Sequence, residues 1–197
     1  YSAGYWDAAL AIFARKSVLE ANGIRVATVD QPWTQEEFDS ALTTLKAAGY
    51  ETPLDIGAED AGEWWPYAYS PMLQSFGGDL IDRSTFLTAE GALNGPEAVA
   101  WGEWFQGLFT DGLASNTGTI GNEEFNRDEV GLSYTGVWNA LASIEAVGDD
   151  LVILPPPDLG QGPKIGGGSW QWGISSECSG AALDGARAYL EFSFAPE

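Results

Sequence analysis

Hydrophobic positions in the first third of the chain predict alternating strands and helices. Residues 8–14 form a short apolar run whose length favours a buried strand. Residues 15–22 favour a helix, and Gly23 is placed to end it. Thr34, followed three residues later by Glu37, predicts a capping box at the start of a further helix. Trp33 and Phe38 stand at the two staple positions. Phe38, Leu42 and Leu45 form the apolar face of the helix, and Gly49 ends it.

The remaining two thirds continue this alternation. Residues 63–76 are aromatic and predict a helix that Pro71 kinks or breaks. Asn94 and Glu97 repeat the capping signal before a helix whose apolar stripe places Trp101 and Trp104 in the core. Further strands are expected at 53–57, 79–82, 86–88, 130–135, 151–154 and 170–175, and those at 79–82 and 86–88 could pair as a hairpin. Further helices are expected near 123–128, 137–147 and 180–194, and loops at 113–122 and 155–168. Helices and strands in alternation predict an α/β fold class.

Composition excludes several functions. Eight basic residues against 29 acidic ones give a formal net charge of −21, which disfavours binding to nucleic acid or to anionic membranes. The chain has no histidine, so a Ser-His-Asp or Cys-His catalytic site cannot form within it. The single Cys178 has no internal disulfide partner. No apolar run reaches the length of a membrane span.

Sequence motifs for catalysis, metal binding or phosphate binding are weak. Adjacent acids such as Glu123 and Glu124 do not supply the separated carboxyl pair of a glycosidase and are typical of a solvated surface. The glycine run at 165–169 precedes a predicted strand rather than a helix, so it does not fit a phosphate loop. Glycine does allow the backbone to approach another kind of ligand closely. We expect no cofactor and no metal site.

Aromatic residues are the strongest chemical signal. Nine Trp exceed what a core of this size needs, and four aromatic residues crowd positions 64–69. Flat rings match the apolar C–H face of a pyranose, and polar side chains and backbone groups match its hydroxyl rim. Trp170 and Trp172 point the same way on the predicted strand, so one environment should hold both. For any single ring, core packing remains the competing interpretation.

The order of these pieces resembles the family-1 bacterial extracellular solute-binding proteins, a group that includes the maltose-binding proteins. The matching segments are Leu-Glu-Ala-Asn-Gly-Ile at 19–24, Pro-Trp-Thr-Gln-Glu-Glu-Phe at 32–38, Ser-Phe-Gly-Gly-Asp-Leu-Ile-Asp at 75–82, Asn-Gly-Pro-Glu-Ala-Val-Ala-Trp at 94–101, Gly-Leu-Ser-Tyr-Thr-Gly-Val-Trp at 131–138, Leu-Val-Ile-Leu-Pro-Pro-Pro at 151–157, Gly-Gly-Gly-Ser-Trp-Gln-Trp-Gly-Ile-Ser at 166–175 and Ala-Arg-Ala-Tyr-Leu-Glu-Phe at 186–192. Each segment is weak alone, but their order across the chain is specific.

The resemblance implies the type II periplasmic-binding-protein fold, in which two α/β lobes joined by a hinge close on a ligand. Residues 1–197 would form a single α/β domain, most of the C-terminal lobe, with a possible hinge stub at 1–7. The first lobe and the final helices would be absent. The resemblance further implies an extracytoplasmic location, as a cell-surface lipoprotein or in the periplasm, and delivery of sugar to ABC permease subunits.

The same resemblance implies ligand-binding residues. Asp7 stands where maltose-binding relatives have an acidic sugar ligand, and the aromatic helix offers Trp64, Tyr67 and Ser70. Ser70 replaces a Trp of those relatives, so the stacking partner is expected elsewhere. Trp138 is a candidate stacking platform. The loop after the prolines adds Gly167, Gly168, Ser169 and Trp170, which offer backbone donors and one ring.

The leading hypothesis is therefore a non-catalytic oligosaccharide-binding component of a sugar importer. One alternative is a binding protein of the same fold for a polyamine, a peptide or a metal complex. A less favoured alternative is a glycoside-processing enzyme.

Overall fold

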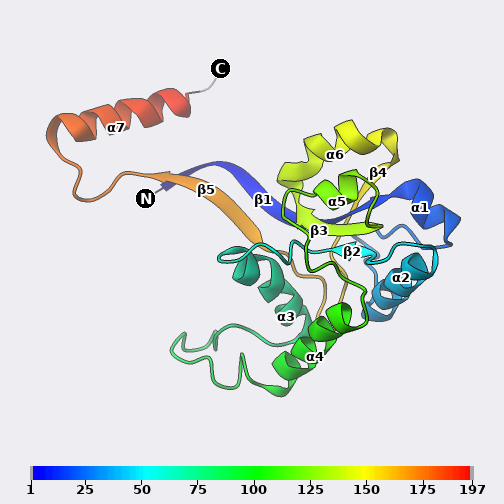
Figure 1. Cartoon of the computed structure of the whole chain (residues 1–197). Helices are drawn as coiled ribbons and strands as arrows, with labels where there is room; N and C mark the ends of the chain where they lie inside the picture. The colour runs from blue at the N-terminus through cyan, green and yellow to red at the C-terminus, as the bar shows by residue number, and fades with distance from the viewer. Residues whose placement is uncertain (1, 196–197) are drawn as a thin grey trace. The chain divides into compact units, whose positions relative to one another are not determined.

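The computed structural model describes residues 2–195, without the side chains of residues 2, 3 and 5–7. Its elements divide into two compact units (Figure 1). The larger unit is Ala9–Gly166, and the smaller combines Tyr1–Ala8 with Gly167–Glu197. Strand β1, Ser2–Arg15, contributes residues to both.

The larger unit contains most of the helices and strands. In chain order they are α1 Lys16–Ala21, α2 Gln35–Ala47, β2 Leu54–Asp55, a π-helical segment Trp65–Tyr69, α3 Ser70–Phe76, α4 Pro96–Thr110, α5 Glu123–Asn126, β3 Leu132–Gly136, a 3-10 turn Val137–Asn139, α6 Ala140–Val147, a second 3-10 turn Gly148–Asp150, and β4 Leu151–Leu154. The smaller unit adds β5 Gly167–Gly173 and α7 Gly180–Ser193.

The sheet of the larger unit follows the order β2-β3-β1-β4. Strand β1 runs antiparallel to β3, with Ile12 opposite Tyr134, and antiparallel to β4, with Ile12 opposite Leu154. The short β2 runs parallel to β3, so that Leu54 lies beside Leu132. This arrangement confirms the α/β class and the central sheet expected from the sequence.

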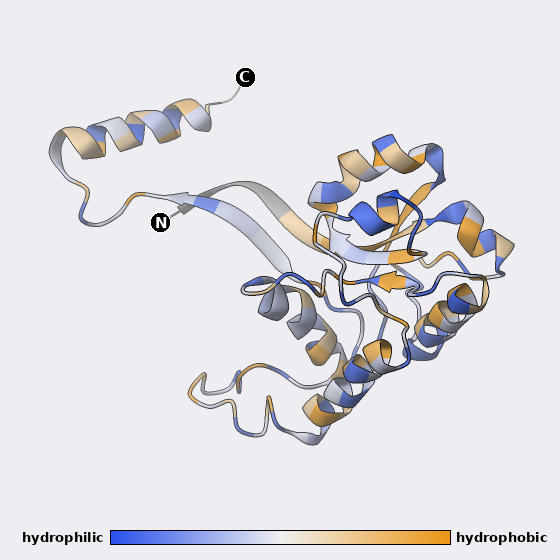
Figure 2. Ribbon diagram, viewed as in Figure 1, coloured by the Kyte–Doolittle hydropathy of each residue, from blue (hydrophilic) through white to orange (hydrophobic). Residues whose placement is uncertain are grey.

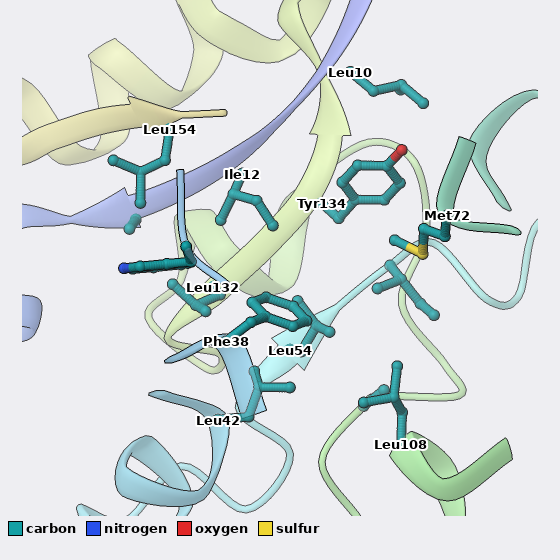
Figure 3. Packing of buried hydrophobic residues seen from close by; sticks show 14 of the residues in the cluster. Leu10, Ile12, Phe38, Leu42, Leu54, Met72, Leu108, Leu132, Tyr134 and Leu154 are labelled. Atoms are coloured by element: carbon teal, nitrogen blue, oxygen red, sulfur yellow. The ribbon is translucent and has the colours of Figure 1, made fainter. Parts of the chain in front are cut away.

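The two faces of this sheet are covered differently. One face buries alternate strand residues, among them Leu10, Ile12, Leu54, Leu132 and Tyr134, against α2, α3 and α4 (Figure 3). The opposite face carries Ala11 and Phe13, which pack against Phe125 of α5 and the partly buried Ala140 and Val147 of α6. Because side chains alternate between the two faces along a strand, β1 contributes residues to the hydrophobic core on each face of the sheet. Figure 2 shows hydrophobic colour on β2 and β4 and mixed colour along α2 and α4.

The clearest helix of the sequence forms as expected. Thr34 Oγ1 accepts from the Glu37 backbone N–H at 3.2 Å, and the Glu37 carboxylate accepts from the Thr34 N–H at 3.0 Å, which completes the capping box. The staple residues Trp33 and Phe38 are buried, with ring centroids 6.2 Å apart. Gly49 follows the helix with a φ of 115°, a conformation that glycine adopts without strain.

Two expectations for the middle of the chain are wrong, the hairpin and the helix cap at Asn94. Residues 79–82 and 86–88 form bends and irregular backbone rather than the strands of a hairpin, and the turn between them is held by the Asp82 carboxylate, which accepts from Ser84 and Thr85. Asn94 does not cap α4; its Oδ1 accepts from Gly91 N–H at 2.7 Å, and Gly95 is the N-cap. Local side-chain hydrogen bonds therefore occupy Asp82 and Asn94, and the backbone bond from Asp82 N–H to the Thr88 carbonyl, at 2.8 Å, does not extend into a strand ladder.

The smaller unit pairs β5 with β1 and adds α7. Strand β5 begins at Gly167, three residues earlier than the sequence predicts. Trp172 of β5 packs edge-on against Tyr189 of α7, with ring centroids 5.5 Å apart. Within residues 2–195, no helix is both long enough and apolar enough to cross a membrane.

Candidate ligand-binding site

Three aromatic side chains of the larger unit form one group, here called the aromatic cluster: Trp64, Tyr67 and Trp138. The centroids of the Trp64 and Trp138 rings lie 6.3 Å apart at 80°, and those of Tyr67 and Trp138 lie 6.3 Å apart at 30°. Trp64 and Tyr67 complete the triangle at 6.1 Å. Such distances are those of interacting rings. Residues about 70 positions apart in sequence thus meet in one place.

Trp64 is the buried support of the cluster, because only 4% of its surface is exposed. Its indole N–H donates to the Ile56 carbonyl at 3.0 Å, and the Tyr69 hydroxyl donates to the same oxygen at 3.1 Å. Gly57, with a φ of 66°, lies directly beside the indole; a Cβ there would stand 2.9 Å from the Trp64 Nε1. The backbone after β2 therefore fixes the Trp64 ring.

Trp138 is the exposed member, with 44% of its surface accessible. Its ring lies over Gly136, where a Cβ would overlap the six-membered ring. The turn that carries it is held by the Asn139 amide, which donates to Thr135 Oγ1 at 2.8 Å and also to the Ile120 carbonyl. The indole is thus held in place while leaving much of its surface free for a partner.

Tyr67 connects the cluster to the glycine run. Its hydroxyl donates to the Gly166 carbonyl at 3.3 Å, and a Cβ on Gly166 would come within 2.6 Å of the Tyr67 carbonyl oxygen. Burial raises the pKa of the Tyr67 phenol above its usual value, so the hydroxyl keeps its proton and acts as a donor at neutral pH. Glycine at 166 is required by this close approach.

The smaller unit carries the other candidate residues. Trp170 is 67% exposed and shares a strand face with Trp172, as alternation predicts. Gln171 Nε2 donates to Ser169 Oγ at 2.8 Å on the opposite face. Gly167 is exposed and Gly168 partly exposed. These side chains and backbone groups are accessible to a ligand.

The residues predicted from the sequence therefore do not all lie together. Trp64, Tyr67 and Trp138 meet in the aromatic cluster, while Gly167, Gly168, Ser169 and Trp170 lie in the smaller unit. Ser70 is the first residue of α3 and is partly buried. Asp7 lies outside the residues whose side chains the structure describes.

Sequence reasoning missed the residues that position the rings. Gly57, Gly136 and Gly166 each sit where a side chain would collide with Trp64, Trp138 or Tyr67. Gly136, close before Trp138 in the sequence, is the one signal of such a contact, but the sequence does not show that the Trp138 indole turns back over Gly136. Asp55, two residues before Gly57, is a buried acid that the sequence did not single out.

Three solved structures resemble nearly the whole chain. Maltose-bound MalE3 of T. maritima matches with a TM-score of 0.79 and 20% identity over 97% of this chain and 49% of its own. UgpB of Mycobacterium tuberculosis, in complex with glycerophosphocholine, matches with a TM-score of 0.78 and 17% identity over 98% and 47%. The GacH receptor of Streptomyces glaucescens, solved unliganded and with acarbose, matches with a TM-score of 0.75 and 21% identity over 98% and 48%. The chain thus spans about half the length of each.

These likenesses confirm the type II periplasmic-binding-protein fold expected from the sequence. No curated protein matches the chain. The family model described as bacterial extracellular solute-binding protein matches residues 1–197, the full length of the sequence. The chain belongs to the bacterial extracellular solute-binding protein family.

Proposed function

We propose that the chain is part of a carbohydrate-binding component of an ABC-type sugar importer, which binds an oligosaccharide between two lobes and has no catalytic role. The observation that carries this proposal is the aromatic cluster, in which a fixed and half-exposed Trp138 stands on a buried Trp64. A ring held in this way loses little freedom when a sugar stacks on it, so its apolar contact contributes fully to binding.

Each candidate residue receives a role from its chemistry. Trp138 and Trp170 stack on pyranose faces, and Trp64 supports Trp138 from behind. Hydroxyls of Tyr67, Ser70 and Ser169, with backbone groups of Gly167 and Gly168, meet the hydroxyl rim. Asp7 accepts from a sugar hydroxyl. This mixture of apolar faces and a few fixed polar groups is typical of small-molecule sites.

The partners follow from family membership and from the length of the relatives. The chain covers 47–49% of the similar structures, and we propose that the rest of a longer protein supplies the facing wall of the cleft. Closure around the sugar then presents the complex to ABC permease subunits. We place the protein outside the cytoplasm, as a lipoprotein or in the periplasm, with no cofactor. The sugar ligands of MalE3 and GacH support this class of ligand.

The first test is a panel of oligosaccharides scored by intrinsic Trp fluorescence on a protein that contains both lobes. We expect one saccharide to give a saturable change. Trp138→Ala should then weaken binding by ~1–3 kcal/mol, the contribution of burying a large apolar side chain. Trp104→Phe is the matched control, because the Trp104 ring packs against Phe38 and Phe76, which are not members of the aromatic cluster. Full affinity in Trp138→Ala would remove Trp138 from the site.

A second candidate is a non-sugar ligand in the same fold. The net charge of −21 favours a cationic polyamine, and UgpB binds glycerophosphocholine rather than a plain sugar. A peptide is the other alternative. Glycoside processing is less favoured, and turnover of a chromogenic glycoside would support it. If no saccharide changes the fluorescence of a folded sample, polyamines and peptides become the next panel.

A further inference from the structure

Asp55 is an acid buried in the larger unit without a full set of partners. It is the last residue of β2 and only 1% exposed. Its Oδ1 accepts from the Gly57 N–H at 2.8 Å, whereas its Oδ2 is buried with no hydrogen-bond partner. The neighbour in register on β3 is Ser133, which is also buried. A buried carboxylate oxygen that lacks a donor destabilises the ionised state.

Residues 115–122, here called the cover segment, lie directly against this carboxyl. A Cβ on Gly118 would overlap the Asp55 carboxyl group. Two hydrogen bonds join the segment to the stretch after β2: Glu59 N–H donates to the Gly118 carbonyl at 3.0 Å, and Ile120 N–H donates to the Asp60 side-chain Oδ2 at 2.6 Å. The Gly118 backbone therefore lies against the Asp55 carboxyl and helps to bury it.

Within the described part of the chain, the charged groups that act on Asp55 are all acidic. Asp60 from the stretch after β2, and Glu123 and Glu124 from α5, act on it by repulsion, and the Tyr69 phenol of the π-helical segment faces it as well. Burial is the largest cause, and with these acids it raises the pKa of Asp55 to about 7. Among the described residues, no three acidic or thiol side chains are placed to hold a metal ion. Protonation therefore removes the uncompensated charge of the Asp55 carboxylate.

A short path joins Asp55 to the aromatic cluster. The next two residues are Ile56, whose carbonyl accepts from Trp64, and Gly57, which lies against the Trp64 indole. Ile120 of the cover segment packs at the same point, since a Cβ on Gly57 would lie 3.0 Å from its Cγ2. The Ile120 carbonyl also accepts from Asn139, the neighbour of Trp138. Movement of the cover segment thus reaches both tryptophans.

We propose that Asp55 is a proton-controlled positioning residue, which keeps the cover segment closed while it is protonated and loosens that segment and the aromatic cluster when its proton leaves to solvent. The consequence for ligand affinity rests on the proposed sugar-binding function. The effect on the ligand-free protein does not.

The sign of the pH dependence follows from proton linkage. An aspartate in an unfolded chain has a pKa of about 3.9. Because the folded pKa of Asp55 is higher, at about 7, the folded protein holds an extra proton between these values. Stability contributed by the protonated group is present below about pH 4, falls as pH rises through the folded pKa, and is gone above it.

The test is a pH titration of the ligand-free chain from about pH 5 to 9, followed by Trp emission and by hydrogen exchange in residues 115–122. We expect one transition near neutral pH in both signals. Asp55→Asn should abolish it, because asparagine keeps the size and the acceptor of the side chain but cannot titrate. Glu124→Gln should move the midpoint to lower pH by removing a repelling charge. Asp149→Asn, far along the chain on an exposed turn, is the matched control and should leave the midpoint unchanged.

An unchanged transition in Asp55→Asn would overturn the proposal. If that variant does not fold, Gly118→Ala provides a second test, because the added methyl must push the cover segment off the carboxyl. Its emission at pH 5 should match that of the unmodified chain at pH 9, and a normal titration would overturn the proposal as well.

A measurement of saccharide affinity at two pH values distinguishes failure of this proposal from failure of the proposed function. On a two-lobe protein, affinity for the identified saccharide should be roughly tenfold weaker at about pH 8 than at about pH 6, a typical size for coupling between two sites. A transition without any saccharide binding would count against the sugar proposal alone. Saccharide binding without any transition would count against the role of Asp55 alone.

Discussion

At the scale of single residues, the aromatic cluster depends on positions that have no side chain. The Trp138 ring occupies the space where Gly136 would carry a Cβ, and the Trp64 indole and the Tyr67 backbone approach Gly57 and Gly166 in the same way. Gly136 has an ordinary extended φ of −90°, so contact with the ring, and not backbone strain, is what requires glycine there.

Gly136→Ala therefore gives a specific prediction. The new methyl must displace the Trp138 ring, so we expect saccharide affinity to fall by ~1–3 kcal/mol, as for loss of the ring itself. Titration of the two-lobe protein by Trp fluorescence measures the effect. Gly102→Ala is the matched control, because a Cβ at Gly102 on α4 meets nothing within 4 Å. Equal affinities in the two variants would show that Trp138 tolerates displacement.

At the scale of elements, the chain shows which signals are read from sequence alone. The capping box at Thr34 and Glu37, the buried run of β1 and the glycine stops are local patterns, and they form as predicted. The hairpin expected at 79–88 fails because Asp82 finds donors within three residues, on Ser84 and Thr85. A hairpin needs a ladder of backbone hydrogen bonds between its strands, and local side-chain bonds can compete with that ladder without any change in the hydrophobic pattern.

The capping box carries the prediction for this scale. Thr34→Ala removes the side-chain acceptor for the Glu37 N–H at the start of α2, which buries Phe38, Leu42 and Leu45. We expect a loss of about 1 kcal/mol in the free energy of unfolding, measured by urea denaturation. Thr43→Ala on the same helix is the control, since the Thr43 hydroxyl donates to the Asp39 carbonyl within the helix and caps neither end. A loss no larger than that of the control would contradict the role of the cap.

At the scale of the whole molecule, the family and part of the candidate site could be predicted from the sequence. The order of motifs identified the solute-binding family, and three of the predicted aromatic residues meet in the larger unit. The positioning residues stayed hidden for a physical reason. The burial of Asp55 depends on the cover segment, about 60 positions later, and its raised pKa depends also on repulsion by acids of α5, so no local pattern around it carries that information.

The net charge of −21 gives the last prediction, which distinguishes the two classes of ligand. A neutral saccharide is held by ring contacts and hydrogen bonds, so its affinity should change less than about twofold between roughly 0.05 and 0.5 M NaCl. A polyamine is drawn by the acidic surface, and screening over that range should weaken it by more than about tenfold. Salt also shields repulsion among the acids, so the free energy of unfolding should rise over the same range. Urea denaturation at each salt concentration is therefore the control, because it separates a gain in stability from a change in the site. Strong salt dependence for the best-binding saccharide would overturn the stacking mechanism, since ring contacts carry no net charge for salt to screen.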